Sequence, residues 1–456
     1  MTLNTDHPTA FAQAVHDGVP AYREFLQKHH VAPDAPFESL PLLDKQHYLL
    51  AYPTESLCWG GTLGDCHLIG ASSGFSKSGT IFWPKRPQDE RNYLEGIEGM
   101  LVANYHIDRK RTLVFVCLAF GTWIGGMQLV SACRILAAQG RLPITVATPG
   151  LNIGEAIEIY ARFGKAYEQV LWLTNVSNVQ LISALLQRRG LTPPPGQMSF
   201  PVVGEYYSET FREWVAERFG HPADDPYCIW TGYGSADTGG IGVETRESIA
   251  LRKYLHHHPE VCRRLFDTEA APMVLAPASD AVVETVNGNI ICTKDQLIPL
   301  VRYDTGDAGG VITRARLEAA GVPAALAVDR AVFVHGRASD AVIFYGTNLR
   351  LSDINDYLLG LSPEHGYGGY YELCEESRDG VTHFVFTLYV TGERKETRRT
   401  AFQHGLVTFL KGQSHEFAAK YDGLSASVGE PLVEVVLADA AQVTGRIKHR
   451  YLVQKT

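Results

Sequence analysis

The chain has 456 residues, of which 45% are hydrophobic and 20% are charged, so it is long enough for about two or three globular domains with sizeable cores. Acidic residues outnumber basic ones by 50 to 41 and give a net charge of −9. This balance argues against nucleic acid or an anionic membrane as a partner, because both attract basic surfaces.

The sequence shows no targeting or redox motif. No apolar run reaches the roughly 20 residues that a membrane helix needs, and the stretch "MTLNTDHPTAFAQAV" lacks the basic and then apolar pattern of a signal peptide. The eight cysteines are scattered without a CxxC pair, which predicts reduced thiols. We therefore expect a cytoplasmic protein, and the oligomeric state is open between a monomer and a homodimer.

The N-terminal region predicts two helices. Apolar residues near helical spacing indicate a first helix from Pro8 to about Lys28, and "PLLDKQHYLLAYP" indicates a second helix that ends at Pro53. The segment "ASSGFSKSGTIFWP", residues 71–84, then lies between two strand-like segments. It predicts either a long polar turn or a loop that wraps a ligand with many oxygens.

Strands and helices alternate from about residue 65 to residue 240. Segments such as "TLVFVCLAF", "PITVAT", "YEQVLWLT" and "MSFPVVGE" predict strands, and the segments between them predict helices. This alternation is typical of a parallel sheet with crossover helices, in which ligands bind where strands end. The Ser/Gly loop and "GYGSADTGG" both fall at such strand ends.

The pattern changes in the second half of the chain. Beyond Gly240 the sequence is β-rich, with an Asn-Gly hairpin signal in "AVVETVNGNIICTK". We therefore expect an α/β fold in which residues 1–336 form a large N-terminal domain with mixed and parallel sheets, crossover helices and a β-rich subdomain. Residues 337–456 predict a small α+β domain.

The Ser/Gly loop has the composition of a phosphate-binding loop. Between Ser72 and Thr80 it offers hydroxyls, backbone N–H groups and one cation, Lys77. Glycine lets the backbone approach a ligand closely, and successive N–H groups can form an anion-binding nest. The Walker pattern GxxxxGK[ST] is absent, so a phosphate cradle and a surface hairpin turn are equal alternatives at this point.

Later segments carry further candidate residues. In "TGYGSADTGG", the tyrosine can lie against a flat base, and Asp237 can hold a divalent cation or cap a helix. In "PLVRYDTGDAGG", Asp307 can accept ribose hydroxyls or belong to an ordinary turn. In "HGRASD", Arg337 suits phosphate or ribose oxygens or a surface ion pair. The basic segment "TGRIKHRYL" is typical of a solvated tail.

The order of these segments resembles the adenylate-forming superfamily, which includes acyl-CoA synthetases, peptide-synthetase adenylation domains and luciferases. Within it, the chain is most similar to the phenylacetate–CoA ligase type. The resemblance covers nearly the whole chain and is strongest in "YGSADTGG", "RYDTGD" and "GRASD". The segments "FGTWIGGMQ" and "GEYYSETFREWV" are similar to the family's acyl-pocket and adenine-site segments.

The resemblance implies a ligand for each matched residue. The phosphates of ATP would be held by Ser72, Ser73, Gly74, Ser76 and Lys77. The adenine and ribose would be held by Gly204, Glu205, Tyr233, Gly234, Ser235, Asp307 and Arg337. The acyl pocket would be lined by Phe120, Trp123, Trp172 and Asn175. Three aromatic rings in that pocket favour an aromatic or medium-length apolar acid.

The resemblance also implies catalytic and hinge positions. Asp237 stands where the family usually has a glutamate near Mg²⁺, and Asp340 stands at the hinge of a mobile C-terminal domain. Arg446 aligns with the family's catalytic lysine, and Lys448 lies two residues further on. An arginine places its donors differently from a lysine, so both residues are candidates for the catalytic cation.

The implied reaction has two steps and uses ATP and Mg²⁺. A carboxylate attacks the α-phosphorus of ATP, which forms an acyl-adenylate and releases pyrophosphate. A nucleophile then takes the acyl group, and it is a thiol, either of CoA as co-substrate or of a carrier protein. Two alternatives stay open: an amide-forming synthetase that uses an amine, and a non-catalytic homologue that binds nucleotide.

Overall fold

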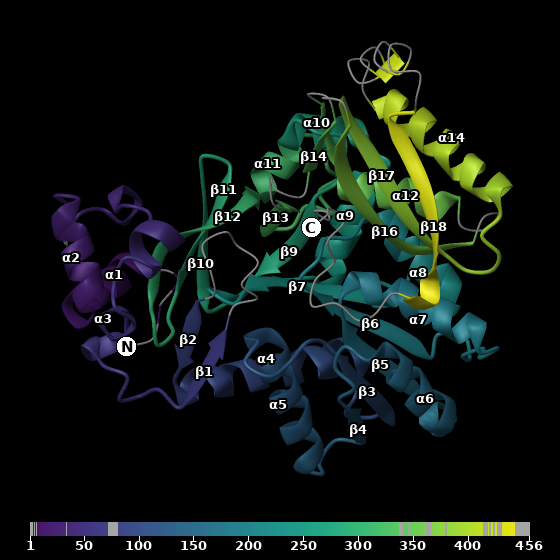
Figure 1. Ribbon diagram of the computed structural model, residues 1–456. Coiled ribbons are helices and arrows are strands. Elements are labelled where there is room, and N and C mark those ends of the chain that lie inside the picture. The colour runs from purple at the N-terminus through teal and green to yellow at the C-terminus, as the bar shows by residue number, and fades with distance from the viewer. Residues whose placement is uncertain are drawn as a thin grey trace.

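A computed structural model describes residues 7–32, 34–71, 81–336, 341–344, 347–361, 366–378, 381–413 and 431–442, with a few single positions besides. Its centre is an 11-stranded sheet in the order β10-β11-β12-β13-β9-β8-β7-β6-β5-β3-β4 (Figure 1). A separate three-stranded sheet, β16-β17-β18, belongs to the C-terminal unit. The expected α/β fold, with a large mixed sheet and a second smaller one, is confirmed.

One half of the large sheet contains the predicted parallel strands. They are β3 (Thr112–Cys117), β4 (Ile144–Ala147), β5 (Gln169–Thr174), β6 (Met198–Val203) and β7 (Ile229–Ser235). The helices around them are α4 (Pro87–Tyr105), α5 (Ile124–Ala138), α6 (Ile153–Phe163), α7 (Val176–Arg188) and α8 (Glu209–Phe219). Every residue of β3 and β5 is buried, as expected for parallel strands with helices on both faces.

Two apolar clusters cover the two faces of this half. Leu101 of α4 and Leu129 of α5 belong to the cluster on one face. Ile157 of α6, Ile182 of α7 and Phe211 of α8 belong to the cluster on the other. Because the helices occupy the faces, a ligand site falls at the edge where the strands end and their loops begin.

The other half of the sheet is largely antiparallel. Its strands are β8 (Gly239–Val243), β9 (Met273–Pro277), β10 (Ala281–Val286), β11 (Asn289–Lys294), β12 (Leu300–Thr313) and β13 (Arg330–Gly336), and its helices are α9 (Arg246–His257), α10 (Pro259–Phe266) and α11 (Arg314–Ala319). Asn287 and Gly288 join β10 to β11 with φ of 52° and 80°, the conformation of a tight hairpin turn. The predicted Asn-Gly hairpin is confirmed.

The N-terminal region differs from its prediction. It contains α1 (Pro8–Gly18), α2 (Pro20–Lys28) and α3 (Thr54–Leu57). The single helix predicted from Pro8 is wrong, because Val19 is extended, as residues before proline prefer. The second predicted helix is only a π-helical turn, Lys45–Leu49. These elements share an apolar cluster with Tyr303 of β12.

The Ser/Gly loop joins the two strands of a hairpin, β1 (Leu68–Ala71) and β2 (Phe82–Lys85). The strands pair antiparallel, with Ala71 opposite Phe82. Residues 72–80 lie outside the described residues. The backbone N–H of Ala71 donates to the carbonyl of Thr122 at 2.6 Å, so the last residue before the loop lies beside the segment that follows β3.

The C-terminal unit packs on helices that cover one face of the large sheet. It contains β14 (Ala341–Phe344), β15 (Thr347–Arg350), α12 (Leu351–Gly360), β16 (Tyr367–Arg378), β17 (Val381–Val390), α14 (Glu396–Gln413) and β18 (Val433–Asp439). Its sheet lies over α7 and α8 (Figure 1), and the apolar cluster of α6–α8 continues into Leu358, Tyr371 and Phe386. Within the described part of the chain, no helix combines the length and apolarity needed to cross a membrane.

Candidate functional site

Three loops meet at the carboxyl edge of the parallel strands. β5 lies between β6 and β3, and the segments after these strands contain Asn175, Gly204–Glu205 and Phe120–Trp123. Because parallel strands end at the same edge, the three segments are neighbours. Ala71 forms a parallel bridge with Trp123, so the hairpin with the Ser/Gly loop reaches this edge too.

Two tyrosine–aspartate pairs connect β7 with β12. The hydroxyl of Tyr233 on β7 donates to Oδ2 of Asp307 on β12 at 2.7 Å. In the reverse direction, the hydroxyl of Tyr303 on β12 donates to Oδ2 of Asp237, just after β7, at 2.7 Å. β7 and β12 are not neighbours in the sheet. The pairs therefore bridge its two halves and hold both predicted carboxylates between the same two strands.

Both tyrosines stay protonated. Burial, followed by the adjacent carboxylate, raises the pKa of Tyr233 and of Tyr303 far above the ordinary range of a phenol. Each hydroxyl is therefore a hydrogen-bond donor at any physiological pH. Asp307 is only 8% exposed, and a charged group that is buried needs such partners. The tyrosines thus fix the orientation of carboxylates that are costly to bury.

The turn after β7 fixes the backbone of Asp237. The hydroxyl of Ser235 accepts hydrogen bonds from the N–H groups of Asp237 and Thr238, each at 3.2 Å. A Cβ atom at Gly234 would lie 2.1 Å from the carbonyl oxygen of Gly239. Any larger residue at position 234 would clash with the backbone of Gly239, so this position requires glycine and the turn is tightly packed.

A buried lysine outside every predicted motif supports the same turn. Lys85 on β2 is 5% exposed, and its Nζ donates to Oε1 of Gln296 at 2.9 Å. Nε2 of Gln296 donates in turn to the backbone oxygen of Asp237 at 2.6 Å. Burial lowers the pKa of Lys85. The first contact joins positions 211 residues apart, so no local pattern in the sequence could have revealed it.

The predicted acyl-pocket residues occupy different surroundings. Trp172 is fully buried, and its ring stacks on Phe115 with the centroids 4.3 Å apart. Since it has no exposed surface and belongs to the core beside α6, we leave it out of the site. Phe120 is 46% exposed, Trp123 is half-buried at the start of α5, and Asn175 is buried at the start of α7.

Of the remaining predicted site residues, the structure describes Gly204 and Glu205, which are predicted to border the adenine. Gly204 has φ of +81°, which favours glycine, and it turns the chain at the end of β6 just before the half-buried Glu205. The other candidates lie outside the described residues and stay predictions: Ser72, Ser73, Gly74, Ser76, Lys77, Arg337, Asp340, Arg446 and Lys448.

The candidate site offers a magnesium ion one protein carboxylate, that of Asp237. Among the described residues, no group of three or more His, Cys, Asp and Glu side chains is arranged to hold a metal. Mg²⁺ is usually bound by one or two carboxylates, with phosphate oxygens and water as the other ligands. Asp237, oriented by Tyr303, fits that limited role if a nucleotide supplies the phosphates.

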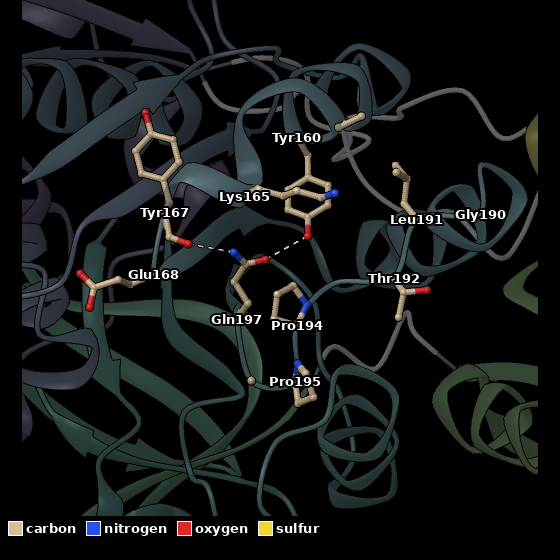
Figure 2. Close-up of a pocket in the computed structure, with 12 residues that line it drawn as sticks. Tyr160, Lys165, Tyr167, Glu168, Gly190, Leu191, Thr192, Pro194, Pro195 and Gln197 are labelled. Atoms are coloured by element: carbon tan, nitrogen blue, oxygen red, sulfur yellow. Dashed lines mark hydrogen bonds between the residues drawn. The ribbon is translucent and has the colours of Figure 1, made fainter.

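A pocket at the opposite edge of the sheet has a structural role. It lies at the amino ends of β5 and β6, away from the loops described above, and Gln197 stands at its centre (Figure 2). The Gln197 side chain accepts from the hydroxyl of Tyr160 at 2.9 Å and donates to the carbonyls of Tyr167 and Gly164 at 2.9 and 3.1 Å. These bonds satisfy its amide and tie two loops together.

The comparisons with known proteins identify the fold. No family model and no curated protein sequence matches the chain. A 2-hydroxyisobutyryl-CoA ligase in the postadenylation state, in complex with 2-HIB-AMP, matches with a TM-score of 0.64 and 14% identity, over 99% of this chain and 88% of the ligase. The acyl acid amido synthetase AtGH3.15, in complex with 2,4-DB, matches with a TM-score of 0.57 and 9% identity, over 98% of this chain and 89% of the synthetase.

A third match is an adenylation, ketoreductase and pseudo Asub multidomain structure of a keto acid-selecting NRPS module. Its TM-score is 0.51 and its identity 10%, over 84% of this chain and 32% of that one. Identities this low carry no residue-level information, and what the three structures share with the chain is architecture. The chain therefore has the fold of the adenylate-forming enzymes.

Proposed function

We propose that the chain is an adenylate-forming ligase that activates a carboxylic acid with ATP. The acid's carboxylate attacks the α-phosphorus, which forms an acyl-adenylate and releases pyrophosphate. The observation that carries the proposal is the reciprocal pairing of Tyr233 with Asp307 and of Tyr303 with Asp237. Two oriented carboxylates match two features of magnesium-bound ATP, the ribose hydroxyls and the cation at the phosphates.

Each carboxylate has its own task in the proposed site. Asp307 accepts hydrogen bonds from the ribose hydroxyls, and Asp237 binds Mg²⁺ where the phosphates lie. This kind of phosphorus chemistry needs positioning and charge neutralisation rather than covalent help from the protein. The other cations of the proposed site are Lys77, Arg337, and either Arg446 or Lys448.

The second step passes the acyl group to an acceptor. We favour a thiol, of CoA or of a carrier protein, because the structures with this fold include a ligase solved with CoA and part of an NRPS module. An amine is the second candidate, because acyl acid amido synthetases have the same fold. Similarity to the phenylacetate–CoA ligase type remains part of this proposal.

We further propose that residues 1–336 and 337–456 work as two domains, with a hinge near Asp340. In support, the last strand of the large sheet ends at Gly336, and the strands that follow belong to separate sheets. Rotation about the hinge would change which groups face the adenylate between the two steps. A cytoplasmic location is also proposed, and it is supported by the eight cysteines, which are all unpaired.

Product analysis by mass spectrometry tests this function. The purified chain is incubated with ATP, Mg²⁺ and pooled carboxylic acids, together with CoA or with mixed amines. Formation of AMP and pyrophosphate with an acyl-CoA or an amide supports the proposal and identifies the acceptor. Tight ATP binding in calorimetry, without AMP from any acid, would indicate a non-catalytic nucleotide-binding protein instead.

A further inference from the structure

Asn175 has a buried side-chain oxygen that has no hydrogen-bond partner in the described structure. The residue is 4% exposed, and its Oδ1 is fully shielded and makes no hydrogen bond. A buried polar group without a partner is unfavourable, and most such groups in folded proteins have one. Asn175 therefore requires an explanation that the folded chain alone does not supply.

The amide is also unused for helix capping. Asn175 is the N-cap residue of α7 and has the extended backbone of a cap, with φ of −91° and ψ of 156°, yet its side chain makes no capping hydrogen bond. Asparagine is among the preferred N-cap residues. At the start of α6 the corresponding residue, Asn152, does cap, and its Oδ1 accepts from the N–H of Glu155 at 3.0 Å.

The neighbouring polar groups are satisfied. Nδ2 of Asn178 donates to Oγ1 of Thr174 at 2.9 Å, and that hydroxyl donates to the carbonyl of Cys117 at 3.1 Å. Other buried polar atoms without a partner, such as Nε1 of Trp172 and the hydroxyl of Tyr105, belong to the apolar clusters of the core. Asn175 differs from them because it follows β5 at the edge where the candidate site lies.

The amide lies between the segment proposed to border the adenine and the segment proposed to line the acyl pocket. Nδ2 of Asn175 lies 3.8 Å from a Cβ atom built on Gly204, so the amide packs beside the segment proposed to border the adenine. The segment after β3, on the other side of β5, carries Phe120 and Trp123 of the proposed acyl pocket. The buried oxygen therefore lies at the end of β5, between the segment of Gly204 and the segment that carries Phe120 and Trp123.

We propose that Asn175 selects a carboxylic acid that carries a hydrogen-bond donor, a hydroxyl or amino group, on its chain near the carboxyl group. The inference rests on the proposed function and narrows its substrate class from carboxylic acids in general to those with a hydroxyl or amino group near the carboxyl group. A ligand hydroxyl would satisfy Oδ1, whereas an apolar analogue would leave it buried and unpaired. Sites built to bind a substrate hydroxyl reject the analogue that lacks it far more strongly than apolar pockets reject an extra methylene.

The test compares acids that differ by a single donor. Suitable pairs are mandelic with phenylacetic acid, 3-phenyllactic with 3-phenylpropionic acid, and phenylalanine with 3-phenylpropionic acid. The kcat/KM for acid-dependent exchange of pyrophosphate into ATP is measured for the wild type and Asn175→Leu. We expect the wild type to prefer the donor-bearing acid by at least about ten-fold in one pair, and the variant to lose that preference.

Asn152→Ala is the matched control, because it removes an asparagine from the N-cap of another crossover helix. It should lower the Tm through loss of a cap and leave the preference between the acids unchanged. Asn175→Leu should not lower the Tm, because it removes an unsatisfied polar group. A fall in Tm with an unchanged preference would show that Asn175 is structural and overturn the inference.

The remaining outcomes separate this inference from the proposed function. A wild type that prefers the acid without the donor in every pair overturns the inference alone. A higher KM for ATP in Asn175→Leu, with the acid preference unchanged, assigns the amide to the adenine and also overturns it. Absence of exchange with every acid contradicts the proposed function, and the inference fails with it.

Discussion

At the scale of single residues, the hydroxyls of Tyr233 and Tyr303 decide how two carboxylates are oriented. Each donates to an aspartate at 2.7 Å and is held protonated by burial. Hydrogen bonds to charged groups contribute roughly 1.5–3 kcal/mol, and an unsatisfied partner that stays buried adds a penalty. The tyrosines therefore matter for the site even though they transfer no proton in the proposed reaction.

Replacement of Tyr303 by phenylalanine tests this role. Tyr303→Phe keeps the ring but removes the donor to Asp237, so the carboxylate proposed to bind Mg²⁺ is less firmly oriented. We expect kcat for adenylation to fall about ten-fold, equivalent to about 1.4 kcal/mol, and the Mg²⁺ concentration for half-maximal rate to rise. Both are measured by pyrophosphate exchange in a magnesium titration.

Tyr254→Phe is the control for this variant. Its hydroxyl donates to the carbonyl of Gly321 at 3.2 Å on the surface, away from the candidate site. It should leave the rate and the magnesium dependence as in the wild type. An unchanged magnesium dependence in Tyr303→Phe would contradict the role assigned to the pair.

At the scale of elements, two glycine turns of the large sheet differ in what they constrain. Gly234 has no room for a side chain, because the carbonyl of Gly239 lies 2.1 Å from the Cβ position. Gly288 has open space around it, and only its φ of +80° favours glycine. The first turn orders the backbone before Asp237, and the second merely reverses the chain between β10 and β11.

The alanine variants of these glycines should therefore separate activity from stability. Gly288→Ala should lower the free energy of unfolding by about 1 kcal/mol and leave adenylation intact. Gly234→Ala should reduce adenylation by at least about ten-fold, because the turn must shift to accept the methyl group. Denaturant unfolding and pyrophosphate exchange measure the two effects, and equal activity in both variants contradicts the assignment of the first turn to the site.

Most elements of the sheet could be predicted from local patterns. Alternating strand and helix segments predicted the parallel half, and the pair Asn287-Gly288 predicted the hairpin, because both signals act within a few residues. The first helix was wrong because its apolar spacing continues through Pro20, where the backbone cannot remain helical. Trp172 was misleading because an aromatic residue in a buried strand has the same pattern whether it lines a pocket or the core.

The partners of the site residues could not be predicted in the same way. Asp237 and Asp307 stand in recognisable segments, but Tyr303 meets Asp237 across 66 positions and Tyr233 meets Asp307 across 74. Lys85 has no motif at all. Such contacts depend on which strands become neighbours, and that information is distributed over the whole sheet.

At the scale of the whole molecule, a half-buried carboxyl group lies at the contact between the two units. Asp356 on α12 lies near Ser208, whose hydroxyl accepts a hydrogen bond from the N–H of Phe211 at the start of α8 at 3.1 Å. Burial raises the pKa of Asp356 to about 7, although the Ser208 hydrogen bond and Arg252 oppose the rise and Asp353 adds to it. The contact therefore favours the protonated acid.

This raised pKa predicts a loss of stability with rising pH. The folded chain binds the Asp356 proton more tightly than the unfolded chain, where an aspartate has a pKa of about 3.9. The stabilisation of the folded chain by the protonated Asp356 is full below about pH 4 and is lost as the pH rises to about 7. Relative to Asp356→Asn, which stays neutral, the wild type should lose on the order of 2 kcal/mol between pH 5 and pH 7.

Denaturant unfolding at pH 5, 6, 7 and 8 measures this difference. Asp329→Asn serves as the control, because Asp329 is 91% exposed in its pair with Arg314, and its stability should parallel that of the wild type. If Asp356→Asn also parallels the wild type over this range, the carboxyl group does not titrate at the contact between the units.

The most direct measurement is the acid-dependent exchange of labelled pyrophosphate into ATP by the wild type and by Asp307→Ala. We expect exchange only when a carboxylic acid is present, with a rate at least about ten-fold lower and a higher KM for ATP in Asp307→Ala. Tight ATP binding without exchange for any acid would contradict adenylate formation, and equal exchange by the two proteins would contradict the role of Asp307.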